Sequence, residues 1–275
     1  MMVRRGCWLL LVLSILPTPA GAEDLFPDAK LAEVIHGILK HKQIDKPTID
    51  PADLKRIFFL EAKGKGIQNL KGLELCTSLA SVDLSDNEVK DLQPLAELKN
   101  IQTLTLTGNQ VQSLQPLQGL VKLQYLQLDR NQVASLEGLS GLENLRALYL
   151  ADNRIEGLGP LKSLGKLRSL HLDRNRIRDL TPLADLKWLS TLGLAGNQVS
   201  DLSPLKGMTE LHYTFLEGNP LQDLSVLVKM AQDDAAGPQR FAPYWFLYVE
   251  ADKLPEAVKP QLEELKKVGV RINQR

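Results

Sequence analysis

Few residues of the chain have the types and spacing that catalysis requires. His171 and Asp173 stand two residues apart, so in a β-strand both side chains would point to the same face. An imidazole beside a carboxylate can act as a general base, but the reaction also needs a nucleophile or a second carboxylate close by. The sequence offers no convincing serine, cysteine or carboxylate at a neighbouring position. We therefore predict that the protein is not an enzyme and has no catalytic residues.

Metal and nucleic-acid chemistry are no better supported. His36 and His41 are five residues apart, a spacing that does not stack two imidazoles on one helix face as zinc ligands. The chain has 33 basic and 33 acidic residues, without the positive excess that nucleic-acid binding requires. We expect no metal, no cofactor and no nucleic-acid partner.

The spacing of the asparagines predicts the architecture that must position any functional residue. Seven of them recur every 22 residues: Asn87, Asn109, Asn131, Asn153, Asn175, Asn197 and Asn219. Before each one, apolar residues alternate with polar ones, as in Leu104-Thr105-Leu106, which predicts one short strand per repeat. One repeat cannot bury its leucines alone, so stacked copies must share a core beneath a parallel sheet. The pattern is a leucine-rich repeat.

The predicted fold class is an α/β leucine-rich repeat solenoid with a curved parallel sheet on its concave side and helical caps at both ends. Each asparagine amide can pair backbone groups left inside the turn, so the seven are expected to form a structural ladder. Proline recurs behind the turn at Pro94, Pro116, Pro160, Pro182 and Pro204, with Gly138 replacing it once. Because proline fixes φ and lacks an N–H group, short 3₁₀ or extended segments are predicted on the convex side.

The outward positions of the strands form the concave face, where a partner would bind. The candidate partner-binding residues are Tyr125, Gln127, Asp129, Arg130, Tyr149, Asp152, His171, Asp173, Arg174, Tyr213 and Phe215. The three tyrosines are candidate anchors, because tyrosine gives rigid contact area and a hydrogen bond at a small cost in entropy. The alternative is a solvated sheet face whose charges pair with one another.

Residues 1–22 are predicted to be a signal peptide. Arg4 and Arg5 precede an apolar run that ends near the small-residue site Ala20-Gly21-Ala22, as in secretory leaders. A retained membrane anchor is the alternative, although the run is about half as long as a span. Without this segment one cysteine remains, Cys76, in a slot that leucine fills in other repeats. We expect it to be buried and inert, with an intermolecular disulfide as the alternative.

The remaining residues divide into two caps and the repeats. Residues 23–56 carry a helical pattern and are predicted to be the N-terminal cap, residues 57–227 the repeats, and residues 228–275 the C-terminal cap. After Asn219 the next strand-like unit comes 33 residues later, which indicates an inserted helix and an irregular final repeat. We predict helices over 224–236 and 255–267 and an edge strand over 268–272. The intervening aromatics, Phe241, Tyr244, Trp245, Phe246 and Tyr248, are interpreted as the core of this cap, with a binding lip as the alternative.

At this point the sequence resembles a known family. The stretches Phe26-Pro27-Asp28-Ala29, Ile49-Asp50-x-Ala52-Asp53-Leu54 and Gly66-Ile67-x-x-Leu70-x-Gly72-Leu73-Glu74, with repeats ending in Asp-Leu-x-Pro-Leu, are similar to the cap and repeats of bacterial internalins over about residues 24–227. The resemblance implies an exported bacterial protein whose concave sheet binds a partner protein. We expect no immunoglobulin-like domain, wall-sorting motif or membrane-spanning tail, so the resemblance is applied to the fold and binding mode only.

The leading functional hypothesis is an exported, non-enzymatic protein-binding module, periplasmic or secreted, monomeric and without stable membrane insertion. The first alternative is an envelope protein that binds glycans or has a structural role, because the concave face offers tyrosines and carboxylates for sugar contacts. A less favoured alternative is a regulatory subunit like those of intracellular phosphatases, which share 22-residue repeats. The predicted leader argues against that class.

Overall fold

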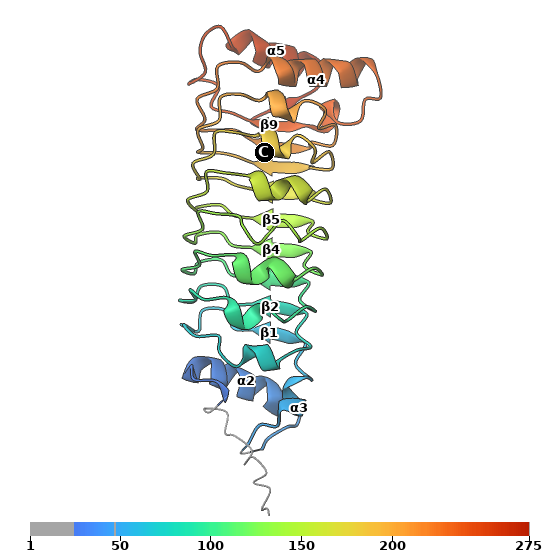
Figure 1. Ribbon diagram of the computed structural model, residues 1–275. Helices are drawn as coiled ribbons and strands as arrows, with labels where there is room; N and C mark the ends of the chain where they lie inside the picture. The colour runs from blue at the N-terminus through green and yellow to red at the C-terminus, as the bar shows by residue number, and fades with distance from the viewer. Residues whose placement is uncertain (1–24, 47, 275) are drawn as a thin grey trace, which may run out of the picture.

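The protein is an elongated stack of ten short parallel strands (Figure 1). The computed structural model describes residues 25–46 and 48–274, so the predicted leader lies outside the described residues. The strands form one sheet and follow one another across it in chain order. They are β1 (Phe59–Glu61), β2 (Ser81–Asp83), β3 (Thr103–Thr105), β4 (Tyr125–Gln127), β5 (Ala147–Tyr149), β6 (Ser169–His171), β7 (Thr191–Gly193), β8 (Tyr213–Phe215), β9 (Phe246–Tyr248) and β10 (Arg271–Ile272). The predicted leucine-rich repeat solenoid is confirmed.

Register along the sheet follows the 22-residue period as far as β8. Leu104 pairs with Val82 on one side and Leu126 on the other, and all three are fully buried. The first and third residues of these strands point the opposite way, toward solvent. Successive residues of each strand therefore point to opposite sides of the sheet, the middle residue into the shared core and the first and third toward the concave face.

The asparagine ladder has the structural role predicted for it. The Asn109 amide nitrogen donates to the carbonyl groups of Leu84 and Leu106 at 2.9 and 3.0 Å. Its oxygen accepts from the backbone N–H of Val89 at 2.9 Å. The other six asparagines make the same kinds of bond to their own and the preceding repeat. Each amide thus pairs backbone groups that would otherwise be buried without a partner.

Short 3₁₀ helices line the convex side, as predicted. They are η1 (Leu73–Leu75), η2 (Gln93–Leu95), η3 (Gln115–Gly119), η4 (Gly159–Ser163), η5 (Thr181–Leu183) and η6 (Ser203–Leu205). All but η1 have the recurring proline in their first turn. In the repeat where Gly138 replaces proline, φ is +96° and an added Cβ would lie 2.3 Å from the Leu114 carbonyl oxygen. Only glycine fits there, and the described residues of that repeat form no 3₁₀ helix.

Helices cover both ends of the stack (Figure 1). At the N-terminal end lie α2 (Ala29–His41) and α3 (Pro51–Leu54). Asp28 caps α2 by accepting from the N–H groups of Lys30 and Leu31, and its second oxygen accepts from those of Gln68 and Asn69 in the first repeat. One carboxylate therefore starts the helix and ties it to the solenoid.

The C-terminal end holds α4 (Ser225–Ala236), η7 (Ala242–Tyr244) and α5 (Lys259–Lys267). The helix predicted over 255–267 is shorter than expected, because residues 255–258 form a turn that leads into α5. The edge strand predicted over 268–272 is reduced to the two residues of β10, since Gly269 has a φ of +94° that no strand adopts. Helix α4 crosses residue 227, where the repeat region was expected to end.

Two further expectations concern burial and membranes. Cys76 is fully buried and unpaired, in agreement with the structural interpretation and against an intermolecular disulfide. Within residues 25–46 and 48–274, no helix has both the length and the apolar character needed to cross a membrane.

Candidate functional site

The candidate site is a column of rings on the concave face. It consists of Tyr125, Tyr149, His171, Phe215 and Tyr248, and is called here the aromatic column. Strand pairing places Tyr149 beside His171, and Phe215 beside Tyr248. The sheet thus collects side chains that stand up to 123 residues apart in the sequence.

The rings of the aromatic column contact one another. Tyr149 stacks on His171 with centroids 4.8 Å apart and planes inclined by 8°, and Phe215 stacks on Tyr248 at 4.7 Å and 7°. Tyr125 leans against Tyr149 at 5.3 Å and 40°. In-register parallel strands lie about 4.8 Å apart, so identical rotamers on neighbouring strands stack face to face. The stacked rings consequently present their edges, rather than their faces, to solvent.

A second, shorter stack runs beside the aromatic column. Tyr213 and Phe246 have centroids 5.2 Å apart, and the Arg271 guanidinium lies over the Phe246 ring at 4.9 Å. Tyr213 has 42% of its surface exposed. On β8 and β9 the two stacks lie side by side and form one aromatic surface.

Asp129 and Asp173 are held beside the aromatic column by backbone contacts. Asp129 Oδ1 accepts from the N–H of Ala151 at 2.7 Å, and Asp173 Oδ1 accepts from that of Ala195 at 2.9 Å. In each pair the alanine stands on the next repeat, where its small side chain leaves room for the carboxylate. The carboxylates are therefore fixed in orientation before any partner arrives.

Tyr125 is fixed by a relay of side chains. Its hydroxyl donates to Gln127 Oε1 at 3.0 Å, and Gln127 Nε2 donates to Asp129 Oδ2 at 3.0 Å. Burial raises the pKa of Tyr125, and the nearby Tyr149 and Asp129 raise it further. The phenol thus keeps its proton and remains a hydrogen-bond donor at neutral pH.

The charged rim of the predicted site is paired within the protein. Arg174 makes two hydrogen bonds to Asp152, at 2.5 and 2.6 Å, and Arg130 binds Asp86 at 3.0 Å. The Arg174 hydrogen bond lowers the pKa of Asp152, and the same bond raises the pKa of Arg174. The alternative interpretation, a solvated sheet face, required charges that pair with one another, and such pairs are present at this rim. Arg130 and Arg174 are bonded at the edge of the face, whereas the rings occupy its centre.

The geometry gives His171 and Asp173 no catalytic partner. His171 Nδ1 lies 3.7 Å from Asp173 Oδ2. Within the described part of the chain, the one polar side-chain contact of this imidazole is with Asp173, and no group of three metal-ligating side chains comes together. The pair contributes a ring and a carboxylate to the concave face.

Two residues of this surface were assigned elsewhere by sequence reasoning. The interpretation of the C-terminal aromatics as cap core is right for Phe241 and Trp245, which are buried. It is wrong for Tyr244, which is 56% exposed, and for Phe246 and Tyr248, which stand on the outward positions of β9. Leu247, between Phe246 and Tyr248, is buried like the inward leucines of the other strands. This alternation of outward and inward residues in the sequence could have placed both aromatics on the concave face.

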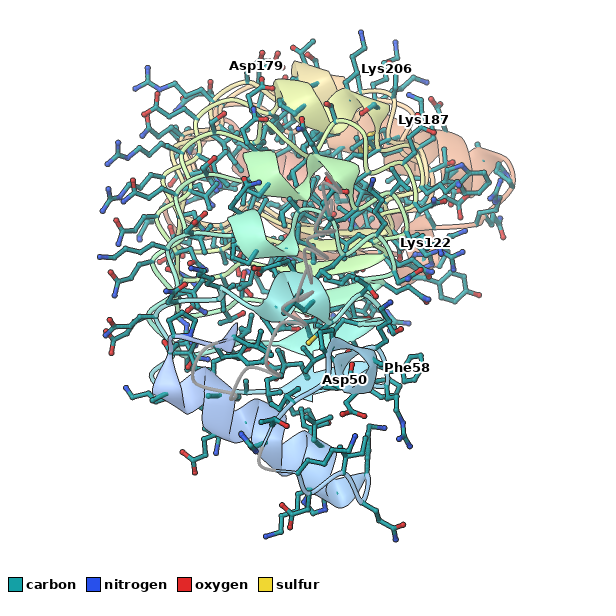
Figure 2. The ribbon with its side chains drawn as sticks, turned by 60° about the horizontal axis from the view of Figure 1, so that its bottom comes forward. Asp50, Phe58, Lys122, Asp179, Lys187 and Lys206 are labelled. Atoms are coloured by element: carbon teal, nitrogen blue, oxygen red, sulfur yellow. The ribbon has the colours of Figure 1, made fainter. Side chains whose placement is uncertain are left out.

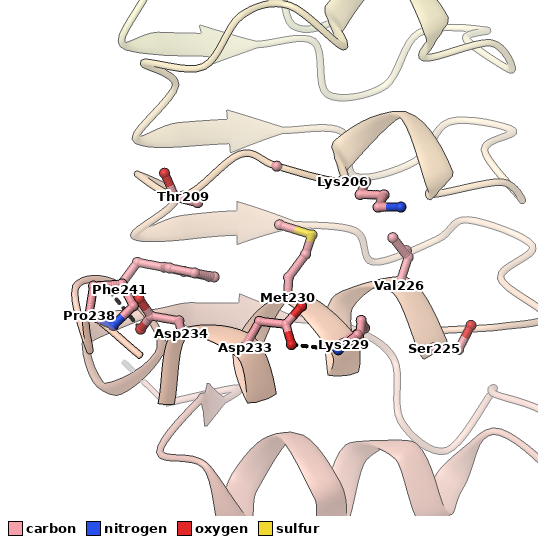
Figure 3. A pocket seen from close by; sticks show the side chains of 11 residues that line it. Lys206, Thr209, Ser225, Val226, Lys229, Met230, Asp233, Asp234, Pro238 and Phe241 are labelled. Atoms are coloured by element: carbon pink, nitrogen blue, oxygen red, sulfur yellow. Dashed lines mark hydrogen bonds and ion pairs between the residues drawn. The ribbon is translucent and has the colours of Figure 1, made fainter. Parts of the chain in front are cut away.

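A cavity of about 610 Å³ lies away from this surface, between η6 and α4 (Figure 3). Met230 and Phe241 give it apolar walls, and Lys229 and Asp233 form an ion pair at its rim. It arises because α4 is wider than the 3₁₀ helices of the other repeats and cannot pack as closely on η6.

Comparison with known proteins agrees with this architecture. A family model described as leucine-rich repeat matches twice, at residues 77–133 and 99–155, and a model of two such repeats matches 143–185. No curated protein sequence matches the chain. A solved leucine-rich repeat protein of Leptospira interrogans shares the fold, at 22% identity and a TM-score of 0.65, over 75% of this chain and 57% of that one.

Two internalins of Listeria monocytogenes are more similar. Internalin F is 26% identical, with a TM-score of 0.79, over 96% of this chain and 75% of its own. Internalin C2 is 33% identical, with a TM-score of 0.74, over 78% of this chain and 95% of its own. With that identity over nearly the whole of a known internalin, this chain belongs to the internalin family of leucine-rich repeat proteins.

Proposed function

We propose that the protein is an exported, non-enzymatic module that binds a partner protein through the aromatic column on its concave face. The leucine-rich repeat solenoid is typical of protein-binding modules. The observation that carries the proposal is the pre-stacked aromatic surface on β4 to β9, because a contiguous apolar patch on the solvent face of a protein marks an interaction site.

Pre-stacking makes these rings suitable as binding anchors. Aromatic side chains dominate the energy of protein interfaces, and rings already held in place lose little entropy when a partner binds. Tyr149 is fixed by a ring on either side and Tyr125 by its relay to Asp129. Recognition would therefore proceed on a rigid surface, with the carboxylates beside it selecting the partner.

The orientation of the rings favours a protein over a glycan. Sugar C–H groups carry partial positive charge and pack on the negative faces of aromatic rings. In the aromatic column, most faces are covered by neighbouring rings. The edges that remain exposed fit the mixed apolar and polar surface of a protein better than the flat face of a sugar.

Export and domain boundaries rest on the sequence. The predicted leader over 1–22 supports secretion or a periplasmic location. We propose residues 23–56 and 228–275 as caps that close the repeats of 57–227, and a monomeric state in solution.

Affinity capture tests the proposal. The bait is the chain from residue 23, used with an envelope fraction and a culture supernatant of the source bacterium, and with surface proteins of any host it colonises. The site variant carries Tyr149→Ala, Phe215→Ala and Tyr248→Ala.

The matched control carries Phe58→Ala and Trp188→Ala, which remove exposed aromatics outside the aromatic column; 49% of Phe58 and 52% of Trp188 are exposed. Phe58 projects from the side of the stack in Figure 2. We expect a protein retained by the wild type and the control but not by the site variant. Equal retention by all three baits, or retention of glycans alone, would overturn the proposal.

A further inference from the structure

The segments that lead into the strands form a surface separate from the concave face. The residue directly before each strand hydrogen-bonds to its counterpart in the preceding repeat. The N–H of Arg146 donates to the Gln124 carbonyl at 2.8 Å, and that of Arg168 donates to the Arg146 carbonyl at 2.9 Å. Equivalent side chains of successive repeats therefore line up along one edge of the sheet. We call the exposed residues of 119–124, 141–146, 163–168 and 185–190, which lead into β4 to β7, the entry flank.

The entry flank has more positive than negative charge. Its cations are Lys122, Arg146, Lys166, Arg168 and Lys187, and its carboxylates are Glu143 and Asp185. In the part of the chain that the structure describes, none of these five cations forms an ion pair, whereas Arg130 and Arg174, which follow their strands, each bind an aspartate. Arg146 and Arg168 stand side by side in neighbouring repeats, so their like charges repel each other. A negatively charged surface would neutralise this excess.

Several of these cations are held in place by neutral or aromatic neighbours. Lys122 Nζ donates to Asn100 Oδ1 at 2.8 Å, and Lys166 Nζ donates to Asn144 Oδ1 at 2.8 Å. An amide oxygen orients an ammonium group without cancelling its charge. The Arg168 guanidinium lies 5.6 Å from the centre of the Trp188 ring. The positive charges are thus presented at fixed places along the entry flank.

Large apolar side chains are exposed among the cations. Val121, next to Lys122, is 51% exposed, and Trp188 is half exposed even though Arg168 lies over its ring. Tryptophan is a large apolar residue, so leaving it in water forgoes much of the free energy that burial would give. The entry flank therefore combines unpaired cations with apolar groups that gain by leaving water.

The same combination continues toward both ends of the stack. Phe58 directly precedes β1, Tyr244 is two residues before β9, and both are exposed. Figure 2 shows Phe58 on the same side of the stack as Lys122 and Lys187. The apolar groups are therefore spread along one long edge instead of gathering at a single point.

We propose that the entry flank binds the surface of an anionic phospholipid bilayer. Each lysine or arginine close to anionic headgroups strengthens binding about fivefold, and tryptophan is enriched at the membrane–water interface, where Trp188 would lie. Protein interfaces are depleted in lysine, and a soluble polyanion would leave Trp188 and Val121 in water. This site goes beyond the proposed function, because it uses a different face and leaves the aromatic column open to a partner.

Co-sedimentation with lipid vesicles tests the assignment. The chain from residue 23 is mixed with vesicles of equal parts phosphatidylglycerol and phosphatidylcholine, and in parallel with vesicles of phosphatidylcholine alone. We expect binding to the anionic vesicles and none to the neutral ones. Binding should weaken as sodium chloride is added, because salt screens the attraction between the cations and the headgroups.

Tryptophan fluorescence shows which surface contacts the lipid. The chain from residue 23 has two tryptophans, the exposed Trp188 and the buried Trp245, since Trp8 lies in the predicted leader. Transfer of Trp188 from water to the membrane interface should move its emission to shorter wavelengths. Trp188→Phe should abolish this shift, because Trp245 stays inside the protein.

Two variants of equal net charge locate the site. The flank variant carries Lys122→Gln, Arg146→Gln and Lys166→Gln. The matched control carries Lys90→Gln, Arg154→Gln and Arg178→Gln, three exposed cations that follow their strands. The flank variant should bind anionic vesicles roughly a hundredfold more weakly, from about fivefold for each cation, whereas the control should stay within about threefold of the wild type. Circular dichroism spectra that match the wild type confirm that both variants are folded.

The outcomes separate this site from the aromatic column. The variant with Tyr149→Ala, Phe215→Ala and Tyr248→Ala should bind vesicles as the wild type does, whether or not it loses a captured protein. Equal loss in the flank and control variants, equal binding to neutral vesicles, or bound protein with unchanged Trp188 emission would overturn the assignment. Wild-type protein that binds soluble polyphosphate but no vesicles would also overturn it.

Discussion

Trp245 donates its indole N–H to the hydroxyl of Thr214 at 2.9 Å, deep inside the C-terminal end of the stack. Both side chains are fully buried. Thr214 occupies the inward position that leucine fills on β7. A polar residue is accommodated at this one place because the 33-residue final unit brings a tryptophan N–H against it. This hydrogen bond joins the last regular repeat to the C-terminal cap.

Replacing Thr214 with valine is expected to destabilise that junction by about 1–3 kcal/mol, because the shape is kept while the buried indole N–H loses its acceptor. Thr214→Ser, which keeps the hydroxyl, should cost clearly less. Urea unfolding followed by Trp245 fluorescence, in a Trp188→Phe background that starts at residue 23, measures the difference. Equal midpoints for the valine and serine variants would show that the bond has no net value.

The attachment of the N-terminal cap is expected to depend on pH through Asp28. Burial raises the pKa of Asp28, but backbone N–H donors from Gln68, Asn69, Leu31 and Lys30 outweigh it and hold that pKa below its ordinary value. Because the folded pKa is the lower one, this carboxylate stabilises the protein above the unfolded pKa of about 3.9. The contribution is lost as the pH falls through the folded pKa.

Asp28→Asn provides the measurement. At pH 7 the variant should be less stable by about 0.5–2 kcal/mol, in the range of a lost helix cap. The difference from wild type should shrink as the pH falls below about 4. Asp179→Asn is a control, because Asp179 binds its own turn and does not connect a cap to the repeats. A difference for Asp28→Asn that persists undiminished at low pH would contradict the prediction.

Features that recur in every repeat could be predicted from the sequence, whereas contacts between particular repeats could not. The asparagine ladder and the inward leucines repeat at a fixed interval, so their places could be predicted without a structure. The pairing of Arg130 with Asp86, two repeats away, could not be predicted. Gly108 stands between them and has no side chain, so the arginine reaches across it to the more distant carboxylate.

The candidate site also has features that the sequence could predict and features that it could not. The register placed Tyr149, His171 and Phe215 on one face, but it gave no rotamers and therefore no stacking. Phe246 and Tyr248 were missed because the helix α4 displaces their strand from the 22-residue interval. An insertion changes the number of residues between two strands, but it leaves the alternation of inward and outward residues within each strand unchanged.

Loss of an inner ladder asparagine is expected to cost more than loss of the last one. Asn131 pairs the backbone groups of Val111, Leu106 and Leu128 inside the core. In Asn131→Ala these buried groups lose their partners, at about 1–3 kcal/mol for each group left without one. Asn219 makes equivalent bonds but is partly exposed, so water can replace some of them. Denaturation midpoints that fall equally in both alanine variants would contradict this argument.

The Cys76 thiol should be unreactive in the folded protein. Burial raises its pKa to about 12, and the Glu74 charge adds to the effect, so almost no thiolate is present at pH 8. Reaction with a thiol-specific disulfide reagent is expected only after denaturant is added. The second cysteine, Cys7, lies in the predicted leader, so the chain from residue 23 reports on the Cys76 thiol alone. Rapid stoichiometric labelling without denaturant would show that the repeat around Cys76 opens readily.

Tyr149→Ala is expected to weaken partner binding strongly while the protein remains folded. Tyr149 lies in the middle of the aromatic column, and central aromatic anchors typically contribute about 2 kcal/mol or more to an interface, roughly a thirtyfold change in Kd. Its stacking on His171 and its contact with Tyr125 are worth about 0.5–1.5 kcal/mol each to the fold. Titration calorimetry with the captured partner gives the first quantity and urea unfolding the second. Trp188→Ala is the matched control, since this exposed ring contacts Arg168 away from the aromatic column. An unchanged Kd for Tyr149→Ala would place the interface elsewhere on the solenoid.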